Sequence, residues 1–159
     1  MRILGIDPAL TITGYGLIDA QKNKLSLIEA GVIITSAKQT LEERLKKIYS
    51  ATRKLISDTK PDALVLEKIY AHYRHPATAY LLGHARGIIC LICAQNNIPL
   101  IEYAATRVKK AVVGRGLASK QQVQRMVAAM LNLKALPRYT DVTDALALAI
   151  AYSYIVSKG

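Results

Sequence analysis

The chain has 159 residues, of which 52% are hydrophobic, and carries a formal net charge of +11. This length suffices for one hydrophobic core and is short for two, so we expect a single domain over residues 1–159. The sequence has no uncharged apolar run of about 18 residues, and Asp7 interrupts the first apolar stretch, which argues against a membrane span or a signal peptide and favours a cytoplasmic protein.

The first predicted element is a hairpin with an aspartate at its tip. Residues 2–6 are apolar and β-prone, and Pro8 lacks the N–H that a sheet ladder needs, so the strand should end near Asp7. Residues 11–13 form a polar turn, and residues 14–18 resume an extended run. Aspartate is common in turns, so Asp7 alone indicates no function.

Residues 25–35 predict a third antiparallel strand, with a bulge at Gly31. A helix should follow up to Asp58, because Thr40 and Glu43 have the spacing of a capping box and apolar residues recur at helical spacing.

Residues 63–68 are apolar on both sides of the predicted strand, as expected for a strand with helices on both faces of its sheet. A right-handed crossover through the preceding helix can lay this strand parallel to the first. Because ligand sites in open α/β sheets lie at the carboxyl ends of strands, we expect Glu67 and Asp7 to emerge together.

The next loop, residues 69–76, is rich in residues that contact nucleic acids. Aromatic rings such as Tyr70 stack on unpaired bases, and Arg74 and the neighbouring histidines can contact phosphates. A tyrosine packed against the base of the loop is nearly as plausible for either tyrosine alone.

Residues 77–95 predict a long apolar helix in which Gly83 and Gly87 allow close approach by a neighbour, either in the core or in another subunit. Cys90 and Cys93 lie in its apolar part, so core packing explains them better than a redox or zinc site, for which His72 and His75 are the only further ligands. A fifth strand follows at residues 99–103.

Residues 104–140 contain eight basic residues and no acidic one, a pattern that suits a phosphate backbone better than a solvated surface of mixed charge. Within this segment Ser119 should cap a helix, with Gln122 completing the box. The eight residues are Arg107, Lys109, Lys110, Arg115, Lys120, Arg125, Lys134 and Arg138.

The last predicted helix spans residues 141–156, with Thr140 as its cap. Asp141 and Asp144 should lie on one face of its first turn, where they repel each other unless a cation lies between them. Four clustered carboxylates without histidine or cysteine ligands suit Mg²⁺ or Mn²⁺, and two such ions commonly serve phosphodiester cleavage.

Four segments, GIDPALTITGYG, LVLEKIY, EYAATRVKKAVVGRGLASKQQV and DVTDALALAIA, together resemble the RuvC family of Holliday-junction resolvases in order and spacing. The resemblance implies an α/β ribonuclease-H-like fold, with a mixed five-stranded sheet and helices on both faces. It also implies a homodimer that nicks two strands of like polarity at four-way junction DNA, and the RuvA-RuvB branch-migration complex as a partner.

The resemblance further implies that two Mg²⁺ ions per subunit, replaceable by Mn²⁺, are bound by Asp7, Glu67, Asp141 and Asp144. It places Tyr70 near the junction centre, where the family more often has phenylalanine, and Lys109 and Lys120 near the scissile strand. Arg74, Lys110 and Arg115 complete the predicted DNA-binding residues.

The chain departs from the family at Ala9, where the family usually has glycine. A turn that needs a positive φ at this residue is therefore not expected.

Two alternative functions belong to other classes of protein. A nucleotide-binding fragment of the actin and sugar-kinase type has a similar first hairpin but needs a second domain to close over ATP. A junction-binding protein without activity would not need four acids.

Overall fold

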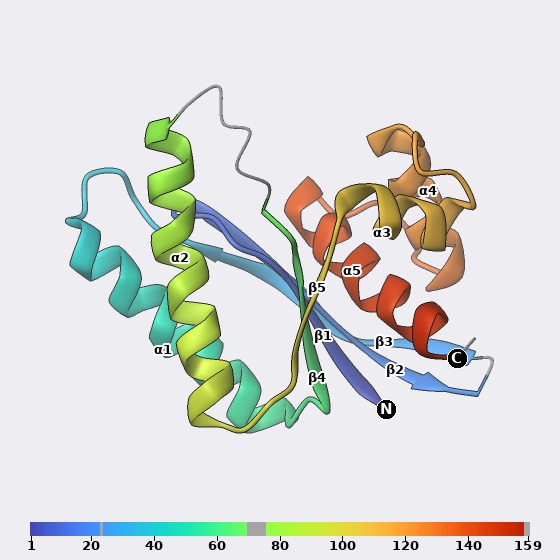
Figure 1. Ribbon diagram of the computed structural model, residues 1–159, viewed down its shortest axis with the longest axis horizontal. Helices are drawn as coiled ribbons and strands as arrows, with labels where there is room; N and C mark the ends of the chain where they lie inside the picture. Colours follow the sequence, from blue (N-terminus) through green and yellow to red (C-terminus); the bar gives the residue numbers. More distant parts are fainter. Residues whose placement is uncertain (23, 70–75, 158–159) are drawn as a thin grey trace.

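The computed structural model describes residues 1–22, 24–69 and 76–157 (Figure 1). Within these ranges no helix combines the length and apolarity needed to cross a bilayer. The elements in chain order are β1 (Arg2–Asp7), β2 (Ile12–Gln21), β3 (Lys24–Ile34), α1 (Leu41–Thr59), β4 (Ala63–Glu67), α2 (Pro76–Gln95), β5 (Leu100–Tyr103), α3 (Ala105–Val113), α4 (Lys120–Met130) and α5 (Thr140–Val156).

The strands form one mixed sheet in the order β3-β2-β1-β4-β5. β1 pairs antiparallel with β2, and β2 with β3, whereas β4 lies parallel to β1 and β5 parallel to β4. The crossover through α1 therefore lays β4 beside β1, as predicted. The α/β class and the mixed five-stranded sheet are confirmed.

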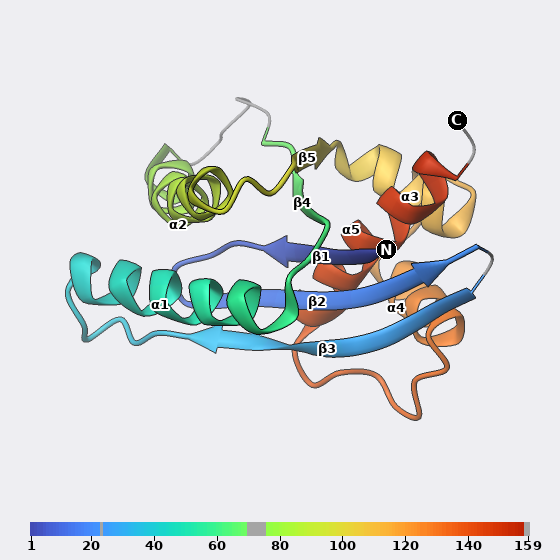
Figure 2. The same cartoon turned by 90° about the horizontal axis from the view of Figure 1, so that it is seen from below.

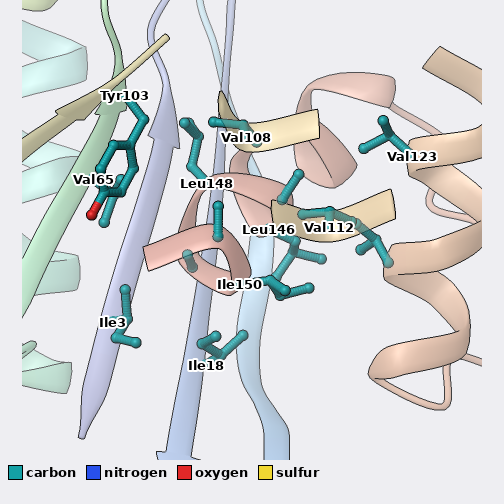
Figure 3. Close-up of a cluster of buried hydrophobic side chains, with 14 of the residues drawn as sticks. Ile3, Ile18, Val65, Tyr103, Val108, Val112, Val123, Leu146, Leu148 and Ile150 are labelled. Atoms are coloured by element: carbon teal, nitrogen blue, oxygen red, sulfur yellow. The ribbon is translucent and has the colours of Figure 1, made fainter. Parts of the chain in front are cut away.

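Helices cover both faces of the sheet, with α1 and α2 on one side and α3, α4 and α5 on the other (Figures 1 and 2). Each side has its own apolar core. Ile3, Ile18 and Val65 pack with α3, α4 and α5 (Figure 3), whereas Leu4 and Leu64 pack with α1 and α2.

Strand alternation determines which way the residues at the strand ends face. Successive residues of a strand point to opposite faces of the sheet. In β1, Ile3 faces the α5 side while Leu4 and Ile6 face the α1 and α2 side, so Asp7 continues on the α5 side. In β4, Val65 faces α5, and the same alternation puts Glu67 on that face.

The predicted capping boxes of α1 and α4 are confirmed. Thr40 accepts from the Glu43 amide, and the Glu43 side chain accepts from the Thr40 amide. Ser119 and Gln122 form the same pair of hydrogen bonds at α4.

The predicted cap of α5 is wrong. Thr140 is the first residue of the helix, Tyr139 occupies the cap position, and no side chain bonds the first amides. Because the helix begins one residue early, Asp141 lies in its first turn and Asp144 in its second. Their spacing of three residues still places both on one face.

The bulge predicted at Gly31 is also wrong. Gly31 pairs regularly with Tyr15, and the register shifts near Ile28 instead. A side chain at residue 31 would collide with the Tyr15 ring, because a β-carbon there would lie 2.8 Å from the Tyr15 hydroxyl oxygen. This glycine is therefore a packing requirement between neighbouring strands.

Candidate active site at the carboxyl ends of β1 and β4

The first turns of α5 lie directly on β1 and β2, because glycines leave no side chain between them. Gly5 pairs with Gly16 across the two strands, and Gly14 pairs with Asp7. A β-carbon on Gly5 would overlap the Ala145 carbonyl, and one on Gly14 would overlap the Asp141 carbonyl. This close approach brings the start of α5 to the strand end that carries Asp7.

The structure brings all four predicted acids into one electrostatic neighbourhood. The pKa of the Asp7 carboxyl is raised to about 7, chiefly by burial and then by Asp144, Asp141 and Glu67, while Lys120 lowers it. Burial disfavours the charged form of Asp7, and the three neighbouring carboxylates disfavour it further.

Glu67 experiences the same competition. Burial raises the pKa of its carboxyl, and the charge of Asp144 raises it further. Lys109 and Lys120 act in the opposite direction and favour the carboxylate. Two predicted DNA-binding lysines therefore lie beside the predicted metal ligands.

Lys120 also forms a direct ion pair with an acid of the cluster. Its Nζ lies 2.6 Å from the Asp144 carboxylate oxygen. The hydrogen bond from Lys120 to Asp144 is the main reason why the lysine pKa is raised. In this arrangement the ammonium group partly neutralises the acid cluster.

Two cavities open beside the acids. A cavity of about 480 Å³ is lined by Asp7, Glu67 and Asp144, with Arg86 among its other walls. A second cavity, of about 240 Å³, shares Glu67 and Asp144 and adds Lys109 and Lys120. The acids thus separate a pocket under α2 from a basic pocket between α3, α4 and α5.

The donor set fits a hard divalent cation, because carboxylate oxygens are the ligands that Mg²⁺ and Mn²⁺ prefer. In the described part of the chain, however, no group of three His, Cys, Asp or Glu side chains converges closely enough to hold a metal ion. A metal ion held by these carboxylates would therefore need them closer together than they lie here.

Comparison with known proteins identifies the family. The profile for "Crossover junction endodeoxyribonuclease RuvC" matches residues 3–152. The chain belongs to the RuvC family. The relative from Rhodopirellula baltica, a crossover junction endodeoxyribonuclease RuvC, is 43% identical over 98% of this chain and 88% of its own length. The relative of that name from Syntrophotalea carbinolica is 44% identical over 97% of this chain and 94% of its own length.

Solved structures show the same fold. The RuvC of Thermus thermophilus in complex with a Holliday junction substrate has a TM-score of 0.94 and 31% identity, covering 100% of this chain and 96% of that chain. The structure of Thermus thermophilus RuvC alone has a TM-score of 0.91 and 29% sequence identity to this chain. The ribonuclease-H-like architecture is thereby confirmed, and the family match decides against a fragment of the actin and sugar-kinase type.

Lys110 and Arg115, two further predicted DNA-binding residues, do not line the cavities beside the acids. Lys110 lines a separate cavity of about 380 Å³ with Arg107 and Tyr154, between α3 and the end of α5. Arg115 is exposed in the turn between α3 and α4. Tyr70 and Arg74, with His72 and His75, lie outside the described residues.

Ala9, which replaces the family's usual glycine, does not require a positive φ and is absent from the residues that adopt one. Thr13 holds the turn instead, because its hydroxyl donates to the Ala9 carbonyl at 2.6 Å. Cys93 is buried in the core with α1 and α2, and both cysteines are free, as expected for core packing.

Two features of this site were not predicted from the sequence. The first is helix α3, which positions Lys109. The sequence signal for this helix is the spacing of Val108 and Val112, two apolar residues four apart that are both buried. Arg86 of α2 lines the larger cavity and donates to the Glu67 carbonyl. An arginine inside a mostly apolar helix is the signal that could have drawn attention to it.

Proposed function

We propose that this protein is a Holliday-junction resolvase that nicks two DNA strands of like polarity at a four-way junction, in recombination and DNA repair. One observation carries the proposal: acids from β1, β4 and α5 line one cavity at the carboxyl ends of β1 and β4, and Lys109 and Lys120 line the cavity beside it. Its relatives are crossover junction endodeoxyribonucleases, and a solved relative is bound to a Holliday junction.

We propose further that Asp7, Glu67, Asp141 and Asp144 would hold two Mg²⁺ ions, with Mn²⁺ as a substitute. Such ions activate a water molecule and stabilise the leaving oxygen of a phosphodiester. Lys120, which pairs with Asp144 in this cluster, would offset the negative charge of a scissile phosphate bound there.

Two nicks need two active sites, so we propose a symmetric homodimer with α2 at the contact. Tyr80, Gly83, Gly87 and Leu91 lie three or four residues apart and are exposed, with Tyr80 65% exposed. A β-carbon on either glycine would meet nothing within 4 Å in the subunit. This stripe therefore leaves room for the close approach of a second subunit.

The cytoplasmic location and the RuvA-RuvB partner stay predictions from the sequence.

The experiment that tests the proposal is cleavage of a synthetic four-way junction labelled on each strand in turn, with and without Mg²⁺. We expect paired nicks in two strands of like polarity, only with the metal, and no cleavage of a linear duplex of the same sequence. A junction that is bound but left intact in Mg²⁺ would instead favour the second candidate, a junction-binding protein without activity.

A further inference from the structure

Arg86 connects three elements behind the acid cluster. It extends from α2, its side chain is only 13% exposed, and one guanidinium nitrogen donates to the main-chain carbonyl of Glu67 at 2.8 Å. The other terminal nitrogen forms an ion pair with the carboxylate of Glu102 on β5. The guanidinium therefore contacts the ends of two adjacent parallel strands at once.

The alternation of β5 explains how Arg86 reaches this position. Tyr103 pairs with Glu67 and packs in the core on the α5 side, so Glu102, which pairs with Leu66, points to the α2 side. Arg86 thus holds the strand ends from the face opposite Asp141 and Asp144.

Arg86 acts on the main chain of Glu67 rather than on its carboxylate. The cations that favour the Glu67 carboxylate are Lys109 and Lys120, whereas Arg86 contacts the Glu67 carbonyl and the Glu102 carboxylate. Arg86 holds the main chain at the point where β4 ends. Glu67 is the last residue of β4, and the amide of Lys68 makes the next hydrogen bond, to the Tyr103 carbonyl at 2.8 Å.

We propose that Arg86, braced by Glu102, is a positioning residue that fixes the end of β4 so that Glu67 is presented to a divalent cation. The inference rests on the proposed function, which makes Glu67 a metal ligand. A planar guanidinium can serve a carbonyl and a carboxylate simultaneously from fixed directions, which a lysine ammonium does less well.

The test compares Arg86→Met, Arg86→Lys and Glu102→Gln with the unaltered protein and with Arg53→Met. Arg53 is an exposed arginine on α1 that lines neither cavity beside the acids. Mn²⁺ binding to the DNA-free protein is measured by electron paramagnetic resonance, and junction binding is measured in EDTA. The Mg²⁺ concentration for half-maximal cleavage and the maximal cleavage rate are determined separately for each variant.

We expect Arg86→Met to weaken Mn²⁺ binding about 10-fold or more, as outer-shell changes at metal sites commonly do. Arg86→Lys and Glu102→Gln should weaken Mn²⁺ binding less, because each keeps part of the contact between Arg86 and the strand ends. The Mg²⁺ requirement should rise in parallel, while junction binding stays within about 3-fold and Arg53→Met matches the unaltered protein. A role in stability alone would lower the melting temperature without changing metal affinity in the folded state.

Unchanged Mn²⁺ affinity in folded Arg86 variants would overturn this inference alone. If Arg86→Met fails to fold, Arg86→Lys and Glu102→Gln decide in the same way. Unchanged Mn²⁺ affinity in Glu67→Gln would instead overturn the metal role that the proposed function gives to Glu67, so the two failures are distinguishable.

Discussion

Gly14 of β2 lies directly against Asp141 of α5, and a β-carbon at residue 14 would overlap the Asp141 carbonyl. The same glycine pairs with Asp7 across the hairpin. A single position without a side chain therefore sets the separation between the acid on the first strand and the acids on the last helix.

Replacing Gly14 with alanine should push the start of α5 away from the sheet. We expect a loss of about 1 to 3 kcal/mol in the free energy of unfolding, as for other overpacked sites, and a larger fall in cleavage than in junction binding. Urea unfolding and cleavage assays measure the two effects. For subunit stability the matched control is Gly83→Ala, which meets nothing within 4 Å and should leave that stability unchanged or slightly raised. Equal free energies of unfolding for the two variants would show that α5 can accommodate a side chain at residue 14.

The raised pKa of Asp7 predicts that the metal-free protein loses stability as the pH rises. The pKa of this carboxyl is about 7 in the folded protein against an ordinary 3.8. Between these values the folded state binds more protons than the unfolded state, so the free energy of unfolding falls with increasing pH. The fall is at most about 4 kcal/mol, since each pKa unit corresponds to about 1.4 kcal/mol.

Urea unfolding in EDTA from pH 4.5 to 8 measures this decline. Asp7→Asn should flatten the decline and make the protein more stable than the unaltered chain at pH 8. Asp58→Asn, at an exposed aspartate on α1, is the control and should keep the decline. A steep decline that persists in Asp7→Asn would assign the effect to another group.

Lys109→Ala and Lys120→Ala should each reduce cleavage and flatten the salt dependence of junction binding. Each lysine lines the basic cavity beside Glu67 and Asp144. Loss of one phosphate contact should reduce the slope of log affinity against log salt by about 0.9. Lys54→Ala is a matched control, because Lys54 also pairs with an aspartate at 2.6 Å but lies on α1. If the control changes the slope equally, the effect is one of net charge.

Tyr70 offers a test of the predicted stacking at the junction centre. Tyr70→Phe keeps the ring and should remain active, whereas Tyr70→Ala should be severely impaired, because stacking on an unpaired base contributes about 1 to 3 kcal/mol. Cleavage rates of the two variants on one junction separate the ring from the hydroxyl. Equal impairment would identify the hydroxyl as the group that matters.

The positions of Asp7 and Glu67 could be predicted because strand ends are readable in a sequence. Pro8 ends β1, and a right-handed crossover leaves few places for β4 other than beside it. The capping boxes at Thr40 and Ser119 were equally local signals and were confirmed. The strand end at Asp7 and the two caps depend on residues close in the sequence, and the place of β4 depends on the handedness of the crossover.

The features that could not be predicted depend on contacts distant in the sequence. Gly31 looked like a bulge in one strand, but its lack of a side chain serves the Tyr15 ring on the next. Arg86 acquires its partners only when α2 is laid against the ends of β4 and β5.

The most direct test of the whole account separates junction binding from junction cleavage in Asp7→Asn, Glu67→Gln, Asp141→Asn and Asp144→Asn. Binding is measured in EDTA and strand nicking in Mg²⁺, on the same labelled junction. If lysines and arginines contact the phosphates and the acids hold the metal ions, each variant should bind within a few-fold of the unaltered protein, or slightly tighter, and cut no strand. A folded variant that still cuts at the normal rate, or that loses binding together with cleavage, would contradict the account.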